Sequence, residues 1–147
     1  MKYAQQLLQG IRKRVGSHEH WSGKPPHLDQ WPQQRWRIYC GEGRFEPSER
    51  NALYSLSTGA ALNFQIKGKG ELITDFEMCV AWPPFEVPFW QLMFHLDPER
   101  QAWPKHPLHH IQFTCGAGQP PFSSWRLPFG EPQPERLLEF LAAQLNG

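Results

Sequence analysis

The sequence predicts an α+β domain in which an N-terminal and a C-terminal helix cover one face of an antiparallel meander of about five strands. Three observations support this class: amphipathic patterns at both ends, alternating apolar and polar residues between them, and fifteen prolines, which disfavour long helices. A length of 147 residues suits one domain, so we expect a single domain over residues 1–147. Aromatic residues make up 14% of the chain and supply large buried areas.

The two terminal segments have the apolar spacing of amphipathic helices. Between Lys2 and Val15 apolar residues recur every four positions, and Gly16 is suited to end the helix. In PERLLEFLAAQL, Pro134 suits the first helical position and Glu135 suits the positive end of the helix dipole. The apolar stripe of this second helix is Leu137, Leu138, Leu141 and Leu145.

Alternating segments between the helices predict the strands. A hairpin over 61–82 is the clearest, with Gly68-Lys69-Gly70 as its turn and alternation running from Leu72 to Trp82. Further strands are expected at RWRIYC, FWQLMFHLD and LHHIQFTC, with a short one in ALYSLST. The residues expected to face the helices are Leu62, Phe64, Ile66, Phe76, Met78 and Val80. The polar segment 17–34 has no period and is predicted to be a loop.

Charge and processing signals restrict the classes of function. Fifteen Lys and Arg against fourteen Asp and Glu leave a net charge of +1, so no global field favours nucleic acid or an anionic membrane. No stretch has the apolar pattern of a signal peptide or a membrane span. Cys40, Cys79 and Cys115 form no C-x-x-C pair, and we expect free thiols in a reducing compartment. The sequence therefore predicts a cytoplasmic protein with no membrane partner.

Four of the seven histidines cluster around the hairpin expected between residues 89 and 115. If its strands pair about the centre of their loop, His95 lies opposite His109 or His110, with Cβ atoms ~4.5–5.5 Å apart. Two imidazoles at that distance can transfer protons, and Arg126 could stabilise a phosphorane-like charge. This arrangement predicts a small nuclease that cleaves RNA through its own 2′-hydroxyl. The alternative is a set of structural histidines on the solvent face of the strands.

The same strands offer a metal-site alternative. His95 and Asp97 are two residues apart and therefore share one face of a strand. With His109 or His110 they would form a two-histidine, one-carboxylate set for iron, manganese or zinc, although such triads usually have wider spacing. A divalent metal is the one candidate cofactor.

Five of the seven tryptophans fall into two groups. Core positions are expected for Trp36, Trp82 and Trp90, which occupy the apolar faces of their strands. Trp31 and Trp103 lie in expected loops and are candidates for an exposed surface that binds another protein or RNA. The arginines suited to tracking a phosphate backbone in that alternative are Arg12, Arg14, Arg35 and Arg37.

The segments FHLDPERQAWPKHPLHHIQF and WRLPFGEPQPERLLEFL combine an aromatic-rich strand ending in Asp, a His-Pro motif, an Arg-x-Pro and a Leu-rich helix. In these features the chain resembles small bacterial proteins grouped as a domain of unknown function. The matching residues are Asp97, His106, Pro107, His109, Phe113, Arg126 and Pro128. Such proteins are suspected components of toxin–antitoxin or phage-defence loci, so the resemblance implies a protein-binding module.

A second resemblance is to ubiquitin-conjugating enzymes. The order of WPPFEVPF, His106-Pro107, Cys115 and Trp125 is similar to their proline turn, His-Pro-Asn motif, catalytic cysteine and tryptophan. Leu108 stands where that family has the asparagine that holds the oxyanion, and one helix follows where several are expected. The sequence thus leaves three alternatives: a bacterial protein-binding module, a histidine-based nuclease and a ubiquitin-conjugating-like fold.

Overall fold

The computed structural model describes residues 2–16, 26–40, 54–55, 61–82, 90–96, 109–115, 127–128, 130 and 133–145. The helices are α1 (Lys2–Gly16) and α2 (Pro134–Leu145). The strands are β1 (His27–Trp31), β2 (Arg35–Cys40), β3 (Tyr54–Ser55), β4 (Ala61–Lys69), β5 (Leu72–Trp82), β6 (Trp90–Leu96), β7 (His109–Cys115) and β8 (Leu127–Pro128). The predicted order of helix, strands and helix is confirmed.

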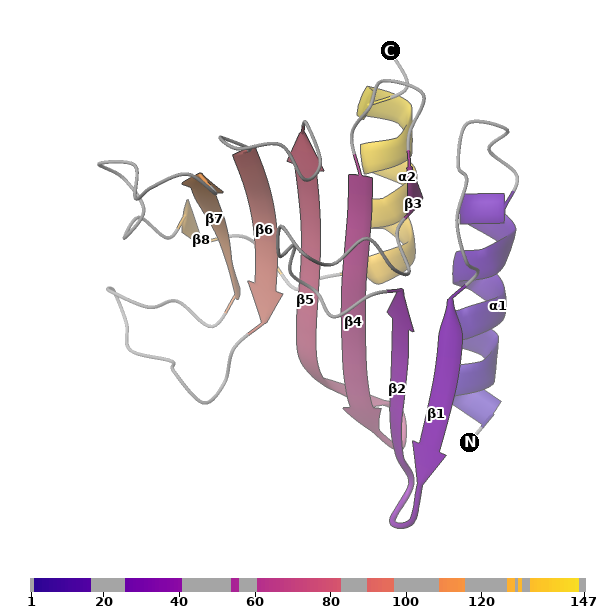
Figure 1. The fold of residues 1–147 in the computed structure, drawn as a ribbon. Coiled ribbons are helices and arrows are strands. Elements are labelled where there is room, and N and C mark those ends of the chain that lie inside the picture. The colour runs from indigo at the N-terminus through magenta and orange to yellow at the C-terminus, as the bar shows by residue number, and fades with distance from the viewer. Residues whose placement is uncertain are drawn as a thin grey trace.

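All eight described strands form one antiparallel sheet, in the order β1-β2-β4-β5-β6-β7-β8 (Figure 1). Strand β3 is off this path and pairs with one end of β4, while β2 pairs with the rest of the same edge. The predicted α+β class is confirmed. The sheet has more strands than the five expected, and two of them, β3 and β8, are only two residues long.

Both helices cover the same face of the sheet (Figure 1). They bury one cluster of side chains with the sheet, to which α1 contributes Ala4, Leu7, Leu8 and Ile11 and α2 contributes Leu138 and Leu141. All six hairpin residues predicted to face the helices are buried in this cluster, so that prediction is confirmed. Neither described helix has the length and apolarity that a membrane crossing requires. Cys40 and Cys79 are buried free thiols, as predicted.

Strand β1 lies in the segment that the sequence predicts as a loop, so that prediction is wrong for residues 27–31. It pairs with β2 in register from His27 opposite Tyr39 to Trp31 opposite Arg35. Its sequence, HLDQW, contains a single aliphatic side chain, so a period-two pattern carries little apolar contrast. Pairing with β2 therefore decides its conformation, as is common for edge strands of low intrinsic propensity.

The turn of the central hairpin differs from the prediction. Lys69 pairs with Leu72, so the turn is Gly70-Glu71, and Gly68 lies inside β4 at an irregularity that follows Lys67. The Trp36 ring explains the glycine at position 68, because a Cβ atom there would overlap it. Trp36 is buried, and its indole Nε1 donates a hydrogen bond of 2.9 Å to the carbonyl of Gly70. One side chain of β2 therefore holds the β4–β5 turn in place.

The irregularity also changes which residues of β5 face the helices. Lys67 pairs with Asp75 and Gly68 with Ile73, which leaves Thr74 as an extra residue. Ile73 packs against the core cluster, whereas the predicted alternation places Thr74 on that side. The phase of β5 therefore shifts near the turn, as a β-bulge causes.

Candidate functional site

The face of the sheet opposite the helices carries polar rows that cross several strands, because residues paired in register project on the same side. We call it the polar face. Its rows are Trp31–Arg35–Lys69, then Asp29–Arg37–Lys67–Asp75, then His27–Tyr39–Gln65–Glu77–His95–His110. The first two rows lie at the end of the sheet where the β1–β2 and β4–β5 turns are found (Figure 1).

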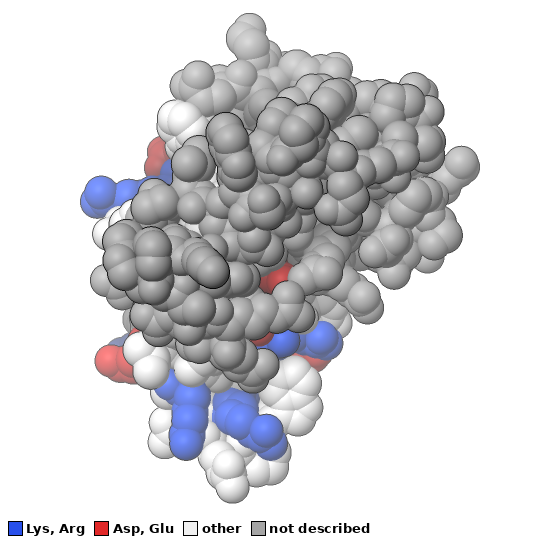
Figure 2. Space-filling model, turned by 90° about the vertical axis from the view of Figure 1, so that its left-hand side faces the viewer, with Lys and Arg blue, Asp and Glu red and all other residues white. Residues whose placement is uncertain are grey.

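A hollow of about 420 Å³ opens at this end of the polar face. Its described lining is Trp31, Arg35, Trp36, Arg37, Lys67, Gly68, Lys69 and Thr74. We call its four cations together with Trp31 the basic patch. Figure 2 shows Lys and Arg side chains gathered at this lower end of the molecule. The described lining contains no carboxylate, but Asp29 and Asp75 pair with two of its cations from beside the hollow, so its net positive charge comes from Arg35 and Lys69.

One cation of the basic patch, Arg37, is held by several neighbours. Its Nη2 atom lies 2.7 Å from Oδ2 of Asp29, and its Nη1 donates to Oε1 of Gln65 at 3.4 Å. The guanidinium carbon is also 4.3 Å from the ring centre of Tyr39 and 5.7 Å from that of Trp31. These contacts fix Arg37 against two aromatic rings, a favourable arrangement for a guanidinium.

The other cations differ in how strongly they are engaged. Lys67 Nζ lies 3.0 Å from Asp75 Oδ2, in an exposed ion pair of small energetic value. Arg35 and Lys69 are exposed, lie opposite each other on β2 and β4, and have no ion-pair partner within the described ranges. They are therefore the cations best placed to meet an anionic ligand.

The two turns that flank the patch are bonded to each other. Gln33 and Gln34 have φ values of 63° and 59°, in the left-handed region that residues other than glycine rarely adopt. The amide of Gly70 donates a hydrogen bond of 3.0 Å to the carbonyl of Gln34. This bond joins the β1–β2 hairpin to the β4–β5 turn, and both carry patch residues. Their spacing is thereby preset before any ligand arrives.

Farther along the polar face, His95 and His110 form a stacked pair. They are cross-strand partners, which confirms one of the two pairings expected from the sequence. Their ring centres are 5.0 Å apart and the rings are nearly parallel, at 7°. Oε1 of Glu77 lies 3.6 Å from Nδ1 of His95.

Burial contradicts the expected setting of these histidines. The sequence places them on a solvent face, but His95 is 5% exposed and His110 is 1% exposed. Their neighbours on the same face, Asn63, Cys79 and Met93, are also buried. The geometry is that of a packed pair at the buried end of the polar face.

His109 lies apart from this pair. It is the cross-strand partner of Leu96, so alternation turns it toward the helix side of the sheet, away from His95. The structure therefore does not bring His95 and His109 together, so the version of the predicted metal set that uses His109 is wrong, and the version that uses His110 stays a prediction. Within the described residues no three His, Cys, Asp or Glu side chains converge on a metal position. Asp97, Arg126 and Trp103 lie outside the described residues.

Of the predicted surface candidates, Trp31 is 42% exposed and lies in the lining of the basic patch. Of the four arginines that the sequence suggested for a phosphate backbone, Arg35 and Arg37 line the patch and Arg12 and Arg14 are not part of its described lining, and the sequence missed Lys67 and Lys69. Both lysines lie in the alternating hairpin, where charged residues are typical of an ordinary solvent face. Their positions opposite Arg37 and Arg35 depend on the pairing of β2 with β4, which no local pattern reveals.

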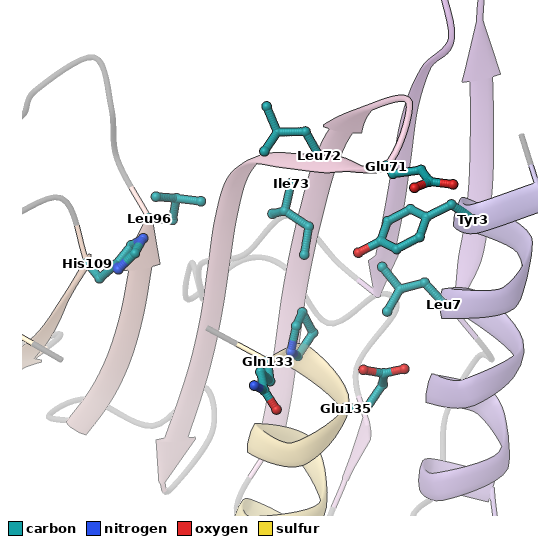
Figure 3. A pocket seen from close by; sticks show the side chains of 10 residues that line it. Tyr3, Leu7, Glu71, Leu72, Ile73, Leu96, His109, Gln133 and Glu135 are labelled. Atoms are coloured by element: carbon teal, nitrogen blue, oxygen red, sulfur yellow. The ribbon is translucent and has the colours of Figure 1, made fainter. Parts of the chain in front are cut away.

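His109 lines a second cavity, of about 540 Å³, on the helix side of the sheet. We call this the acidic cavity. Its described lining is Tyr3, Leu7, Glu71, Leu72, Ile73, Leu96, His109, Gln133, Pro134 and Glu135 (Figure 3). These residues come from the starts of both helices, the β4–β5 turn and the facing ends of β6 and β7. Sequence reasoning missed this cavity because its parts are far apart along the chain.

The fold and its two hollows define an α+β protein with one antiparallel sheet and a candidate ligand surface on each face. Comparison with known proteins finds no family model, curated protein or solved structure that matches the chain. The resemblances drawn from the sequence therefore stay predictions, and function is argued from geometry.

Proposed function

We propose that this protein binds single-stranded nucleic acid through the basic patch. The observation that carries the proposal is the 420 Å³ hollow whose described lining combines an exposed tryptophan with two cations, Arg35 and Lys69, that have no described ion-pair partner. Positively charged grooves with aromatic stacking surfaces are typical of proteins that bind single strands. A net charge of +1 means that attraction of phosphate depends on this local concentration of charge.

The residues of the patch have distinct roles in this proposal. The exposed ring of Trp31 stacks on a base, while Arg35 and Lys69 meet backbone phosphates on either side of the β2–β4 pairing. Arg37 is already engaged by Asp29 and two rings, so it positions Trp31 more than it neutralises phosphate. Because stacking and phosphate contacts read little sequence, we expect weak base preference and strong salt dependence.

Two alternatives from the sequence are weighed against this one. A protein partner would use the same exposed Trp31, since aromatic residues and arginine are also enriched at protein interfaces. The nuclease alternative is less well supported, because the His95 and His110 rings are buried and stacked. A catalytic pair must reach the scissile phosphate, so we propose binding without cleavage.

The test is fluorescence anisotropy of a labelled oligouridylate twelve-mer over a range of salt concentrations. The double variant Arg35→Gln/Lys69→Gln removes two cations that neutralise phosphates, so the slope of log affinity against log salt should become shallower by about 0.7 for each of them. The matched control is Lys13→Gln/Arg136→Gln, which removes two exposed cations from the helices instead. We expect the control to retain the parent slope.

Two results would contradict the proposal. One is an absence of binding by the parent protein at low salt, which would favour the protein-binding alternative for the same surface. The other is an equally shallow slope in the control, which would mean that general charge, not the patch, attracts the oligonucleotide. Cleavage of the oligonucleotide that disappears in a His110→Gln variant would restore the nuclease alternative.

A further inference from the structure

We propose that the acidic cavity binds a small organic cation, namely a primary ammonium group carried on an apolar chain. The cavity encloses about 540 Å³, within the range of ~300–1,000 Å³ usual for small-molecule sites. It lies on the helix side of the sheet and shares no described residue with the basic patch. The inference is therefore independent of nucleic-acid binding.

The charge of the lining favours a positively charged ligand. Glu71 and Glu135 are its charged residues, and the described lining contains no lysine or arginine. Glu71 is exposed on the β4–β5 turn and has no ion-pair partner in the part of the chain that is described. An incoming ammonium group can therefore pair with Glu71 without displacing a described cation. A phosphate or carboxylate ligand would meet repulsion at the same place.

The two carboxylates of the described lining lie on the same side of the cavity (Figure 3). In Figure 3, Glu71, Tyr3 and Glu135 lie on the side nearer to α1, and His109 lies on the opposite side beside Leu96. Glu135 reaches α1, because its Oε1 would be 2.9 Å from a Cβ atom placed on Gly10. The Glu71 carboxylate can accept hydrogen bonds from a primary ammonium group, and Glu135 adds negative charge to the same side of the cavity.

Aliphatic side chains form much of the remaining lining and favour a ligand that has an apolar part as well as a positive charge. Leu7 and Leu96 are buried and Ile73 is partly buried, so they form an aliphatic surface beside the acidic side. Leu72 is 66% exposed and also lines the cavity. An exposed aliphatic side chain beside a cavity is suited to cover the apolar part of a bound ligand. Acceptors on one side and aliphatic groups on another match an alkylammonium ion.

The first test compares three probes of equal chain length: n-hexylammonium, hexan-1-ol and hexanoate. Binding is followed by amide chemical shifts and by calorimetry on the whole protein. We expect n-hexylammonium to bind more tightly than hexan-1-ol and hexanoate more weakly than both. The shift changes should centre on Glu71, Leu72, Ile73, His109 and Glu135.

The second test uses variants that separate charge from apolar contact. Glu71→Gln should weaken n-hexylammonium about threefold, as expected of an exposed charge pair, and leave hexan-1-ol unchanged. Leu72→Ser should weaken both probes. Glu139→Gln makes the same change on α2 outside the cavity lining and should alter neither. Equal affinity for n-hexylammonium and hexan-1-ol, an unchanged affinity in Glu71→Gln, or shift changes centred on another surface would each overturn the proposal.

Discussion

The basic patch and the acidic cavity lie on opposite faces of the same sheet and meet at one turn. Lys69 lines the first and Glu71 lines the second, with only Gly70 between them along the chain. Four cations and no carboxylate line one hollow, and two carboxylates and no lysine or arginine line the other, within the described residues. Since Asp29 and Asp75 pair with Arg37 and Lys67, the contrast between the two hollows is between the cations Arg35 and Lys69, which have no described ion-pair partner, and the carboxylates Glu71 and Glu135. Because the sheet lies between the two surfaces, one small domain can keep groups of opposite charge apart.

The two hollows also differ in how rigidly they are built. The basic patch stands on paired strands, with Arg37 held by Asp29 and Tyr39 and the flanking turns joined by the Gly70–Gln34 hydrogen bond. The acidic cavity is assembled from the paired strands β5, β6 and β7 and from the starts of two helices, which meet the sheet through side-chain packing. Changes to the core should therefore affect both hollows, whereas changes to β2 and its turns should affect the patch first.

The largest expected effect comes from Phe76→Ala, which removes a fully buried ring from the core that supports both hollows. The lost transfer free energy and the resulting cavity should lower the free energy of unfolding by ~3–5 kcal/mol. Urea denaturation of parent and variant measures the loss. Leu72→Ala serves as the control, because that side chain is mostly exposed and should cost within ~0.5 kcal/mol. A loss below about 1 kcal/mol for Phe76→Ala would contradict the core described here.

Gly68→Ala should disturb the basic patch more than the acidic cavity. A Cβ atom at this position overlaps the Trp36 ring, and such overpacking costs ~1–3 kcal/mol of stability. Displacement of Trp36 should also break its hydrogen bond to Gly70 and change tryptophan fluorescence. Gly130→Ala is the control, since nothing lies within 4 Å of a Cβ atom there. If Gly68→Ala matched this control in stability and fluorescence, the close approach of Trp36 would be refuted.

Trp31→Ala should weaken binding of the oligouridylate by ~1–3 kcal/mol, the usual contribution of one stacked base. The same change should leave n-hexylammonium binding at its parent value, because Trp31 lines only the basic patch. Anisotropy and calorimetry measure the two affinities on one preparation. Trp31→Phe, which keeps an aromatic face, should recover part of the loss. Equal affinity for the oligonucleotide in all three proteins would exclude stacking on this ring.

The smallest expected effect is a gain in stability from Gln33→Gly. A left-handed backbone costs a residue other than glycine ~1–2 kcal/mol, while glycine loses ~0.5–1 kcal/mol through the entropy of the unfolded chain. The net gain should be about 0.5 kcal/mol, measured by thermal or urea unfolding. Gln30→Gly, in the extended strand β1, has only the entropic term and should destabilise. A loss of stability in Gln33→Gly would show that the turn is not strained at this residue.

Some features of this structure follow from local sequence patterns, and others depend on the tertiary arrangement. The sequence by itself determined both helices, the central hairpin and the six side chains that face the helices, because each depends on a period of 3.6 or 2 that neighbouring residues display. It also indicated Trp31 as an exposed-surface candidate and Arg35 and Arg37 among four arginines suited to a phosphate backbone, but it did not place them on one surface.

Only the tertiary structure decided the remaining features, because they depend on register between segments that no local period specifies. The pairing of β6 with β7 placed His110 opposite His95 and turned His109 to the other face, a difference that one residue of slip would reverse. The irregularity at Lys67 and Gly68 placed Ile73 instead of Thr74 against the core, since it accommodates an extra residue in β5. Pairing with β2 across the turn at residues 32–34 made β1 a strand, because backbone hydrogen bonds can hold a segment whose side chains lack an alternating apolar face. The long-range pairing of β2 with β4 brought Lys69 beside Arg35.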